Sequence, residues 1–294
     1  MNSIFKGLGI ALVTPFKNDS SVDYDALLSL VDYHIESGVD FLCILGTTAE
    51  TPCLTREEKQ TIKEKIVKHV KGRMPILMGC GGNCTATVVE EIKNTDWTGI
   101  DGILSVCPMY NKPSQEGLYQ HFRAIAEVSP LPVVLYNVPG RTGVNLTADT
   151  TLRLAHDFKN IVAIKEASGK IDQIREILEK RPEGFDVLSG DDSLTLQVMM
   201  AGGVGIISVV GNAIPREFGR MVHLMQEGRM AEAKIINDEL FEFYSLMFID
   251  GNPSGVKSAL NVLGKAENKL RLPLVPVTER TGKRIAELLK DITI

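Results

Sequence analysis

The segment Ile161-Val162-Ala163-Ile164-Lys165-Glu166-Ala167-Ser168 joins a short apolar, β-branched run to a cationic side chain. Such a run predicts a buried strand of the kind found in parallel sheets. Lysine is rarely buried, because an ammonium group is costly to remove from water and tends to lose its proton instead. A neutral amine can attack a carbonyl carbon and form a Schiff base, so Lys165 is a candidate catalytic residue. Alternatively, Lys165 reaches solvent at the strand end or pairs with Glu166.

The run at 161–168 is one of eight similar apolar runs. Their starts lie roughly 18 to 34 residues apart, which suits a strand, a crossover helix and two loops. Helical patterns lie between them, and Thr55-Arg56-Glu57-Glu58 is a capping box before one such pattern. Eight βα units favour a closed (β/α)8 TIM barrel over an open doubly wound sheet. The predicted strands are 8–16, 41–48, 75–81, 102–108, 132–138, 161–168, 186–192 and 204–212.

The end of the chain follows a different pattern. No strand is predicted after 230, and helical stretches are broken at Asn252-Pro253 and at 273–276. We therefore expect a catalytic barrel over 1–226 and a C-terminal helical region over 227–294 that packs on it.

Composition excludes several classes of function. The chain has 294 residues and a formal net charge of −5, and no Lys/Arg run offers a basic surface to nucleic acid. No signal-peptide pattern and no apolar stretch near the ~18 residues needed for a membrane span are present, so we expect a cytoplasmic protein. The odd number of cysteines argues against a disulfide framework. Cys80 and Cys84 lack the further ligands of a metal site, so we expect neither metal nor cofactor.

Polar groups gather where several predicted strands end. In a TIM barrel the active site lies at the C-terminal ends of the strands. Thr47 and Thr48, Tyr110, Tyr136 and Lys165 all fall at such ends, which makes one site the natural hypothesis. The alternative is structural, with the threonines capping a turn and the tyrosines packing as core aromatics.

These segments together resemble 4-hydroxy-tetrahydrodipicolinate synthases, within the superfamily of Schiff-base class I aldolases. The resemblance spans the whole chain, with the motifs in order. It is carried by Gly46-Thr-Thr-Ala-Glu50, Tyr110-Asn-Lys-Pro-Ser-Gln-Glu-Gly117, Tyr136-Asn-Val-Pro-Gly-Arg-Thr-Gly143, Ile164-Lys-Glu-Ala-Ser168 and Ser189-Gly-Asp-Asp192.

The resemblance implies a condensation of pyruvate with L-aspartate 4-semialdehyde in the diaminopimelate and lysine pathway. Lys165 would hold pyruvate as a Schiff base, and Tyr136 would transfer protons through Thr47 to Tyr110, which the family takes from a neighbouring subunit. A hydrogen-bonded relay suits tyrosine, which is a weak base at neutral pH. At least a dimer is then required, and the family habit is a homotetramer built as a dimer of dimers.

The same resemblance assigns the substrate contacts. Thr48 would bind the pyruvate carboxylate, Ile207 would touch pyruvate from the barrel floor, and Arg141 would bind the carboxylate of the semialdehyde. Related aldolases of N-acetylneuraminate or 2-keto-3-deoxy sugar acids share Lys165 and Tyr136, so this activity is the alternative. Arg141 favours the synthase.

Three smaller expectations concern segments outside the strands. We expect Asp191 and Asp192 to cap the helix that follows them, and 202–205 to be a tight turn without a ligand.

The resemblance matches the family's lysine-inhibition site to seven positions here, and the family's glutamate and tyrosine are absent at two of them, Thr87 and Met109. Arg56 and Lys59 add positive charge, so we expect no inhibition by L-lysine. The other three matched positions are Thr51, Pro52 and Asn83.

Overall fold

The computed structural model describes residues 4–292 and contains the eight predicted strands. The strands are β1 (Gly7–Ala11), β2 (Phe41–Ile44), β3 (Ile76–Gly79), β4 (Gly102–Val106), β5 (Val133–Asn137), β6 (Ile161–Glu166), β7 (Asp186–Ser189) and β8 (Gly205–Ser208). The α-helices are α1 (Tyr24–Glu36), α2 (Arg56–Val70), α3 (Thr85–Asn94), α4 (Gln115–Val128), α5 (Pro139–Thr142), α6 (Ala148–Asp157), α7 (Ile171–Lys180), α8 (Thr195–Met200), α9 (Pro215–Gln226), α10 (Met230–Leu246), α11 (Ser254–Val262) and α12 (Glu279–Asp291). Short 3₁₀ turns are η1 (Thr47–Ala49), η2 (Thr51–Cys53), η3 (Asp192–Leu194) and η4 (Val210–Asn212).

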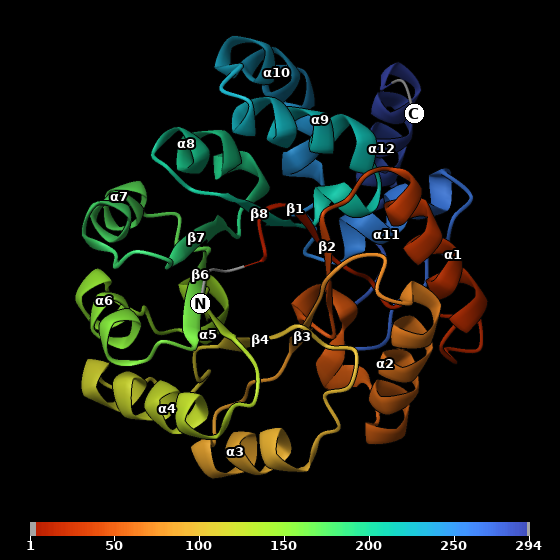
Figure 1. The fold of residues 1–294 in the computed structure, drawn as a ribbon. Coiled ribbons are helices and arrows are strands. Elements are labelled where there is room, and N and C mark those ends of the chain that lie inside the picture. Colours follow the sequence, from red (N-terminus) through yellow and green to blue (C-terminus); the bar gives the residue numbers. More distant parts are fainter. Residues whose placement is uncertain (1–3, 293–294) are drawn as a thin grey trace. The chain divides into compact units, whose positions relative to one another are not determined.

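The strands form a closed parallel barrel in the order β1 to β8, which confirms the predicted TIM barrel (Figure 1). The predicted strands were too long, chiefly at their C-terminal ends. The run at 41–48, for example, leaves the sheet after Ile44, and the run at 204–212 leaves it after Ser208. Leu45 has a φ of 53°, and η1 and η4 follow, so the backbone turns where apolar composition alone suggested a continuing strand. Thr47 and Thr48 lie on η1, the first of these turns.

Contacts divide the chain into two compact units, which we call the first and second units. The first unit holds Pro75–Ile207 and the residues up to Lys6, and the second holds Gly7–Met74 and the residues from Ser208 onward. The strands of the first unit are buried between its helices, with α3, α4, α6 and α7 on their outer side (Figure 1). Gly102 on β4 is required there, because a Cβ at this position would lie 2.6 Å from the ring of Phe5.

The second unit contains β1, β2, the first two helices and the C-terminal helices. The predicted capping box is present, since Thr55 accepts a hydrogen bond from the Glu58 backbone and Glu58 accepts one from the Thr55 backbone. Helix α10 packs against α9, and α12 packs against α10 and α11. Between 227 and 292 the described chain contains α10, α11 and α12 and no strand, with irregular stretches at 247–253 and 263–278. The boundary at 226/227 stays a prediction.

Helix α1 contains a buried histidine, which should make the folded protein less stable in acid. Burial lowers the pKa of His34 to about 3, and nearby Lys265 acts in the same direction. In the unfolded chain His34 binds a proton near pH 6.5, whereas in the folded chain it does not. Its contribution to the free energy of unfolding is therefore fully present above pH 6.5 and is lost as the pH decreases toward 3. We expect His34 to account for about 2 kcal/mol of lost stability between pH 6.5 and pH 5.

Urea unfolding at these two pH values measures this effect. His34→Leu should flatten the pH dependence, whereas His156→Leu, which changes an exposed histidine of α6, should leave it as in the wild type. Equal slopes in wild type and His34→Leu would contradict the assignment.

All five cysteines are free thiols. Among residues 4–292 no helix is long and apolar enough to cross a membrane.

Candidate active site

Lys165 lies near the C-terminal end of β6 and is only 6% exposed. Its register partner on β5 is Tyr136, and the Lys165 Nζ lies 4.4 Å from the centroid of the Tyr136 ring. The structure thus brings together two of the predicted catalytic residues. Gly190 provides the space, because a Cβ there would lie 3.1 Å from the Cε of Lys165 and 2.7 Å from the Cβ of Ala167. This role of Gly190 was not predicted from the sequence, although the residue belongs to the motif Ser189-Gly-Asp-Asp192.

Glu166 points into a different environment from Lys165, as expected for neighbours on a strand. Its carboxylate accepts hydrogen bonds from Asn137 Nδ2 at 3.2 Å, from Gln173 Nε2 at 2.9 Å and from the Ser168 backbone at 2.7 Å. Burial raises the pKa of Glu166, and these donors oppose the rise. The alternative in which Glu166 pairs with Lys165 is therefore wrong. Amide donors satisfy the carboxylate and leave the amine facing the tyrosine.

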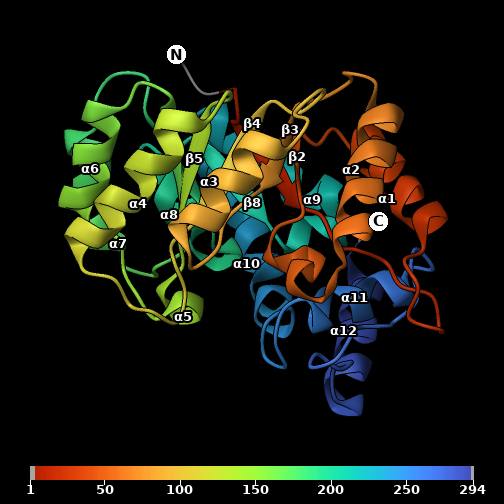
Figure 2. The same ribbon diagram turned by 90° about the horizontal axis from the view of Figure 1, so that it is seen from below.

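The loop after β5 carries Arg141 on helix α5, which lies beyond the end of the strand (Figure 2). Arg141 is exposed, and the carbonyl of neighbouring Thr142 accepts a hydrogen bond from the Tyr110 backbone at 3.2 Å. Tyr110 has a φ of 71°, which is unusual for a residue with a side chain, and its side chain is 88% exposed. A strained backbone that holds an aromatic ring in solvent is a candidate for a functional contact.

The remaining first-unit residues fall as follows. Ile207 is buried on β8, at 1% exposure. Asp191 caps η3 by accepting from the Ser193 backbone at 2.9 Å, which confirms the predicted cap for this residue, whereas Asp192 is buried within η3. Gly202 has a φ of 105° and begins the turn before β8, so the turn is confirmed.

Thr47 and Thr48 open η1, immediately after β2 in the second unit. Thr48 is 2% exposed, and its hydroxyl accepts a hydrogen bond from Asn252 Nδ2 at 3.0 Å. Glu50 ends this turn in the left-handed conformation. The shared site of these threonines with Lys165 stays a prediction.

Glu50 forms a buried ion pair that sequence reasoning missed. Lys257 on α11 donates to Glu50 Oε1 at 2.5 Å and to the Lys269 carbonyl at 2.9 Å, and both side chains of the pair are fully buried. Burial lowers the pKa of Lys257 to about 8, against the opposing charge of Glu50. A signal existed, because Lys257 lies in the apolar segment Val256-Lys257-Ser258-Ala259-Leu260.

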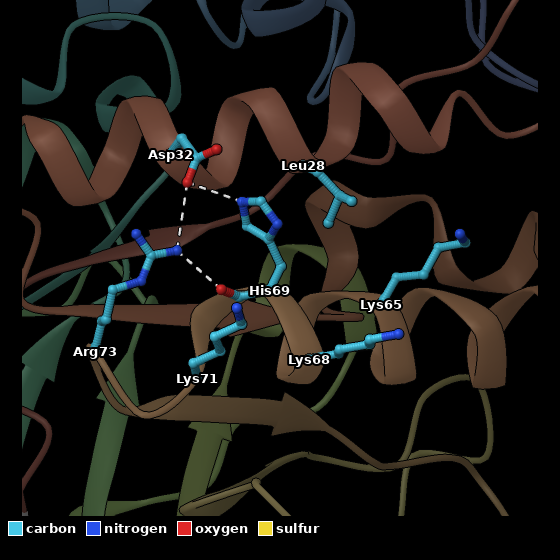
Figure 3. A pocket seen from close by; sticks show the side chains of 7 residues that line it. All are labelled: Leu28, Asp32, Lys65, Lys68, His69, Lys71 and Arg73. Carbon is cyan, nitrogen blue, oxygen red and sulfur yellow. Dashed lines mark hydrogen bonds and ion pairs between the residues drawn. The ribbon is translucent and has the colours of Figure 1, made fainter.

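A hollow on the surface of α1 and α2 offers a different environment (Figure 3). Three of its side chains contact one another, since Asp32 lies 2.8 Å from His69 and 3.4 Å from Arg73. Arg73 also donates to the His69 carbonyl near the end of α2. These contacts complement the C-terminus of a helix, where cations are favoured, and they include no nucleophile at a strand end.

The described residues, 4–292, contain no group of three His, Cys, Asp or Glu side chains that could hold a metal ion. The reactive side chains that the structure brings together are the amine of Lys165 and the ring of Tyr136. A buried amine beside a tyrosine suits attack on a carbonyl carbon with local proton transfer.

Comparison with known proteins gives consistent results over the whole chain. The Dihydrodipicolinate synthetase family matches residues 4–292. A relative from Phocaeicola vulgatus, named 4-hydroxy-tetrahydrodipicolinate synthase, is 60% identical over 289 residues, covering 98% of this chain and 97% of the relative. The crystal structure of dihydrodipicolinate synthase from Aquifex aeolicus has a TM-score of 0.94 and 41% identity, covering 98% of both chains. The chloride-inhibited synthase from Acinetobacter baumannii, solved with pyruvate, has a TM-score of 0.94 and 38% identity, covering 98% of this chain and 99% of that one.

Proposed function

Because the chain belongs to the dihydrodipicolinate synthetase family of lyase-type condensing enzymes, we propose that it condenses pyruvate with L-aspartate 4-semialdehyde, as a 4-hydroxy-tetrahydrodipicolinate synthase. The observation that carries the proposal is the buried amine of Lys165 against the ring of Tyr136. The Acinetobacter baumannii relative was solved with pyruvate, which supports the choice of first substrate.

The first half of the reaction forms a nucleophile from pyruvate. The Lys165 amine attacks the ketone carbon, and the ketone oxygen leaves as water to give an iminium ion. This cation withdraws electrons from the adjacent methyl group, which loses a proton to become an enamine. Tyr136 would transfer this proton, because its ring lies next to the Lys165 amine.

The second half joins the two substrates. The enamine carbon attacks the aldehyde carbon, and the aldehyde oxygen takes up a proton. The amine of the semialdehyde then attacks the iminium carbon, which closes the ring and releases Lys165. Thr47 would pass protons between Tyr136 and the Tyr110 of a neighbouring subunit. The exposure of Tyr110 supports this shared role, which requires at least a dimer; the homotetramer and the cytoplasmic location stay predictions.

The substrate carboxylates have separate partners in this proposal. Thr48 would bind the pyruvate carboxylate through its hydroxyl and its backbone N–H, and Ile207 would provide an apolar contact to pyruvate. Arg141 would bind the carboxylate of the semialdehyde, for which a planar guanidinium is well suited.

Pyruvate consumption by the purified protein tests the proposal. The protein is offered aspartate semialdehyde, N-acetylmannosamine or glyceraldehyde as the second substrate. Rapid turnover with the semialdehyde alone is the expected result. Preference for a sugar aldehyde would instead identify a sugar-acid aldolase, and inactivity with all three would overturn both activities.

We also propose that the enzyme is insensitive to L-lysine. The positions matched to the family's inhibition site include Arg56 and Lys59, and they have Thr87 and Met109 where the family has a carboxylate and a tyrosine. A cationic ligand is repelled by such a charge balance. Activity should remain within about 10% of its starting value at 1 mM L-lysine, because no compensating carboxylate is present. Half-inhibition below 1 mM would contradict this proposal, and an L-arginine titration controls for ionic effects.

A further inference from the structure

The turn with Thr48 is bonded to the C-terminal part of the second unit through buried side chains. Asn252, which precedes α11, is 6% exposed and donates to the hydroxyl of Thr48 at 3.0 Å. The two residues are 204 positions apart in sequence. Figure 2 shows α11 beside the turns that follow β2. A side chain brought from so far along the chain to a candidate substrate group calls for a physical reason.

Hydrogen-bond chemistry supplies one. A threonine hydroxyl has one proton to donate and can accept at its lone pairs. Because the Asn252 amide donates to the Thr48 oxygen, the hydroxyl proton must point to another acceptor. A hydroxyl that already accepts a bond is also a stronger donor, since bonds in a chain polarise one another. The contact with Asn252 thus prepares Thr48 to donate to an anion.

The rest of the turn is fixed from several sides, so the hydroxyl cannot readily move away. Thr51 Oγ1 donates to the Gly46 carbonyl at 2.7 Å, and Thr14 Oγ1 donates to the Ala49 carbonyl at 2.8 Å. Glu50 accepts from Lys257 and from the Arg271 backbone, the latter at 3.0 Å. These bonds restrain the backbone on both sides of Thr48, so the hydroxyl is the group that the contact with Asn252 can orient.

We propose that Asn252 is a positioning residue that holds the Thr48 hydroxyl as a donor toward the carboxylate of pyruvate. This inference rests on the proposed function, which places that carboxylate at Thr48. On this proposal Asn252, which lies outside the barrel strands, strengthens the binding of pyruvate and leaves the binding of the semialdehyde unchanged.

Two variants of Asn252 have different expected effects. In Asn252→Asp the new carboxylate can only accept hydrogen bonds. It therefore accepts one from the Thr48 hydroxyl, which can then no longer donate to the substrate, and it also repels the substrate carboxylate. The KM for pyruvate should rise about tenfold or more, because a charge-assisted hydrogen bond is lost and repulsion is added. In Asn252→Ala the hydroxyl is merely unrestrained, and a rise of about threefold to tenfold is expected. Neither should change the KM for the semialdehyde by more than about twofold, because Arg141 binds that substrate.

A double-mutant cycle separates positioning from a general structural effect. Pyruvate affinity is measured as the pyruvate concentration that gives half-maximal borohydride-trapped adduct, which requires no second substrate. In a Thr48→Val background, Asn252→Ala should have no further effect on this concentration, since the hydroxyl it orients is gone. The control is Asn261→Asp, the same substitution at an exposed residue of α11 that bonds to the Ala266 carbonyl. Thermal midpoints of all variants are recorded with and without pyruvate.

The outcomes are distinguishable. A wild type that forms no pyruvate adduct overturns the proposed function and this inference with it. A wild type that forms the adduct while Asn252→Asp keeps its KM for pyruvate overturns the inference alone. So does an Asn252→Ala effect of the same size in both backgrounds, because that result assigns Asn252 a structural role independent of Thr48. A selective, Thr48-dependent loss of pyruvate affinity, absent in Asn261→Asp, supports it.

Discussion

Lys165→Ala is expected to reduce turnover by on the order of 10⁴-fold or more, because alanine has no amine to form the covalent intermediate. Lys165 is the buried amine in contact with Tyr136, and Gly190 leaves space for it. The variant should remain folded, since alanine removes a polar group from an apolar strand and leaves the partners of Glu166 in place.

Borohydride reduction followed by mass spectrometry measures the chemistry directly. Wild type treated with pyruvate should gain the mass of one reduced pyruvate adduct, and Lys165→Ala should gain none. Lys159→Ala, which removes an exposed lysine of the same unit, should behave as the wild type does. An adduct on Lys165→Ala would show that another lysine is the nucleophile.

Lys257→Met is expected to destabilise the second unit by about 3–5 kcal/mol, because it leaves the Glu50 carboxylate buried without its cation. The loss includes the hydrogen bond to the Lys269 carbonyl, which methionine cannot replace. The aliphatic volume is retained, so the effect is electrostatic and not a cavity. Urea or thermal unfolding measures it.

The double variant Lys257→Met/Glu50→Gln should recover a large part of this loss. In the wild type the Arg271 backbone N–H donates to Glu50 Oε2. Glutamine carries no charge and still offers an oxygen to this donor. The matched control is Lys283→Met, which breaks the exposed pair with Glu279 on α12 and should change stability by less than about 1 kcal/mol. Equal midpoints for wild type and Lys257→Met would refute the proposed importance of the buried pair.

Sequence alone could predict the barrel because each strand and helix is recorded locally, in apolar runs and in caps such as that of Thr55. It could also predict Lys165, because a cation in a buried strand conflicts with its surroundings. The strand ends were misplaced, because hydrophobicity does not show where the backbone turns, as it does at Leu45. The same reasoning allowed a pairing of Glu166 with Lys165, which strand geometry prevents.

The partners of Asn252 and Lys257 could not be predicted in this way, although the apolar segment around Lys257 did mark that lysine as unusual. Their partners, Thr48 and Glu50, are more than 200 positions away, and no local pattern records which distant groups will meet. Asn252 could be recognised only as part of a helix break beside a proline. Contacts of this kind follow from tertiary packing, which determines which buried polar groups satisfy one another.

These long separations also set an order of events during synthesis. The turn after β2 leaves the ribosome early, whereas its partners Asn252, Lys257 and Arg271 follow 204 to 221 residues later. Ribosomes add about 5–20 residues per second, so the turn waits on the order of ten seconds or more for them. A nascent chain therefore carries the turn with Thr48 well before Asn252 can bond to it, and the turn has all of these partners only after Arg271 has been made.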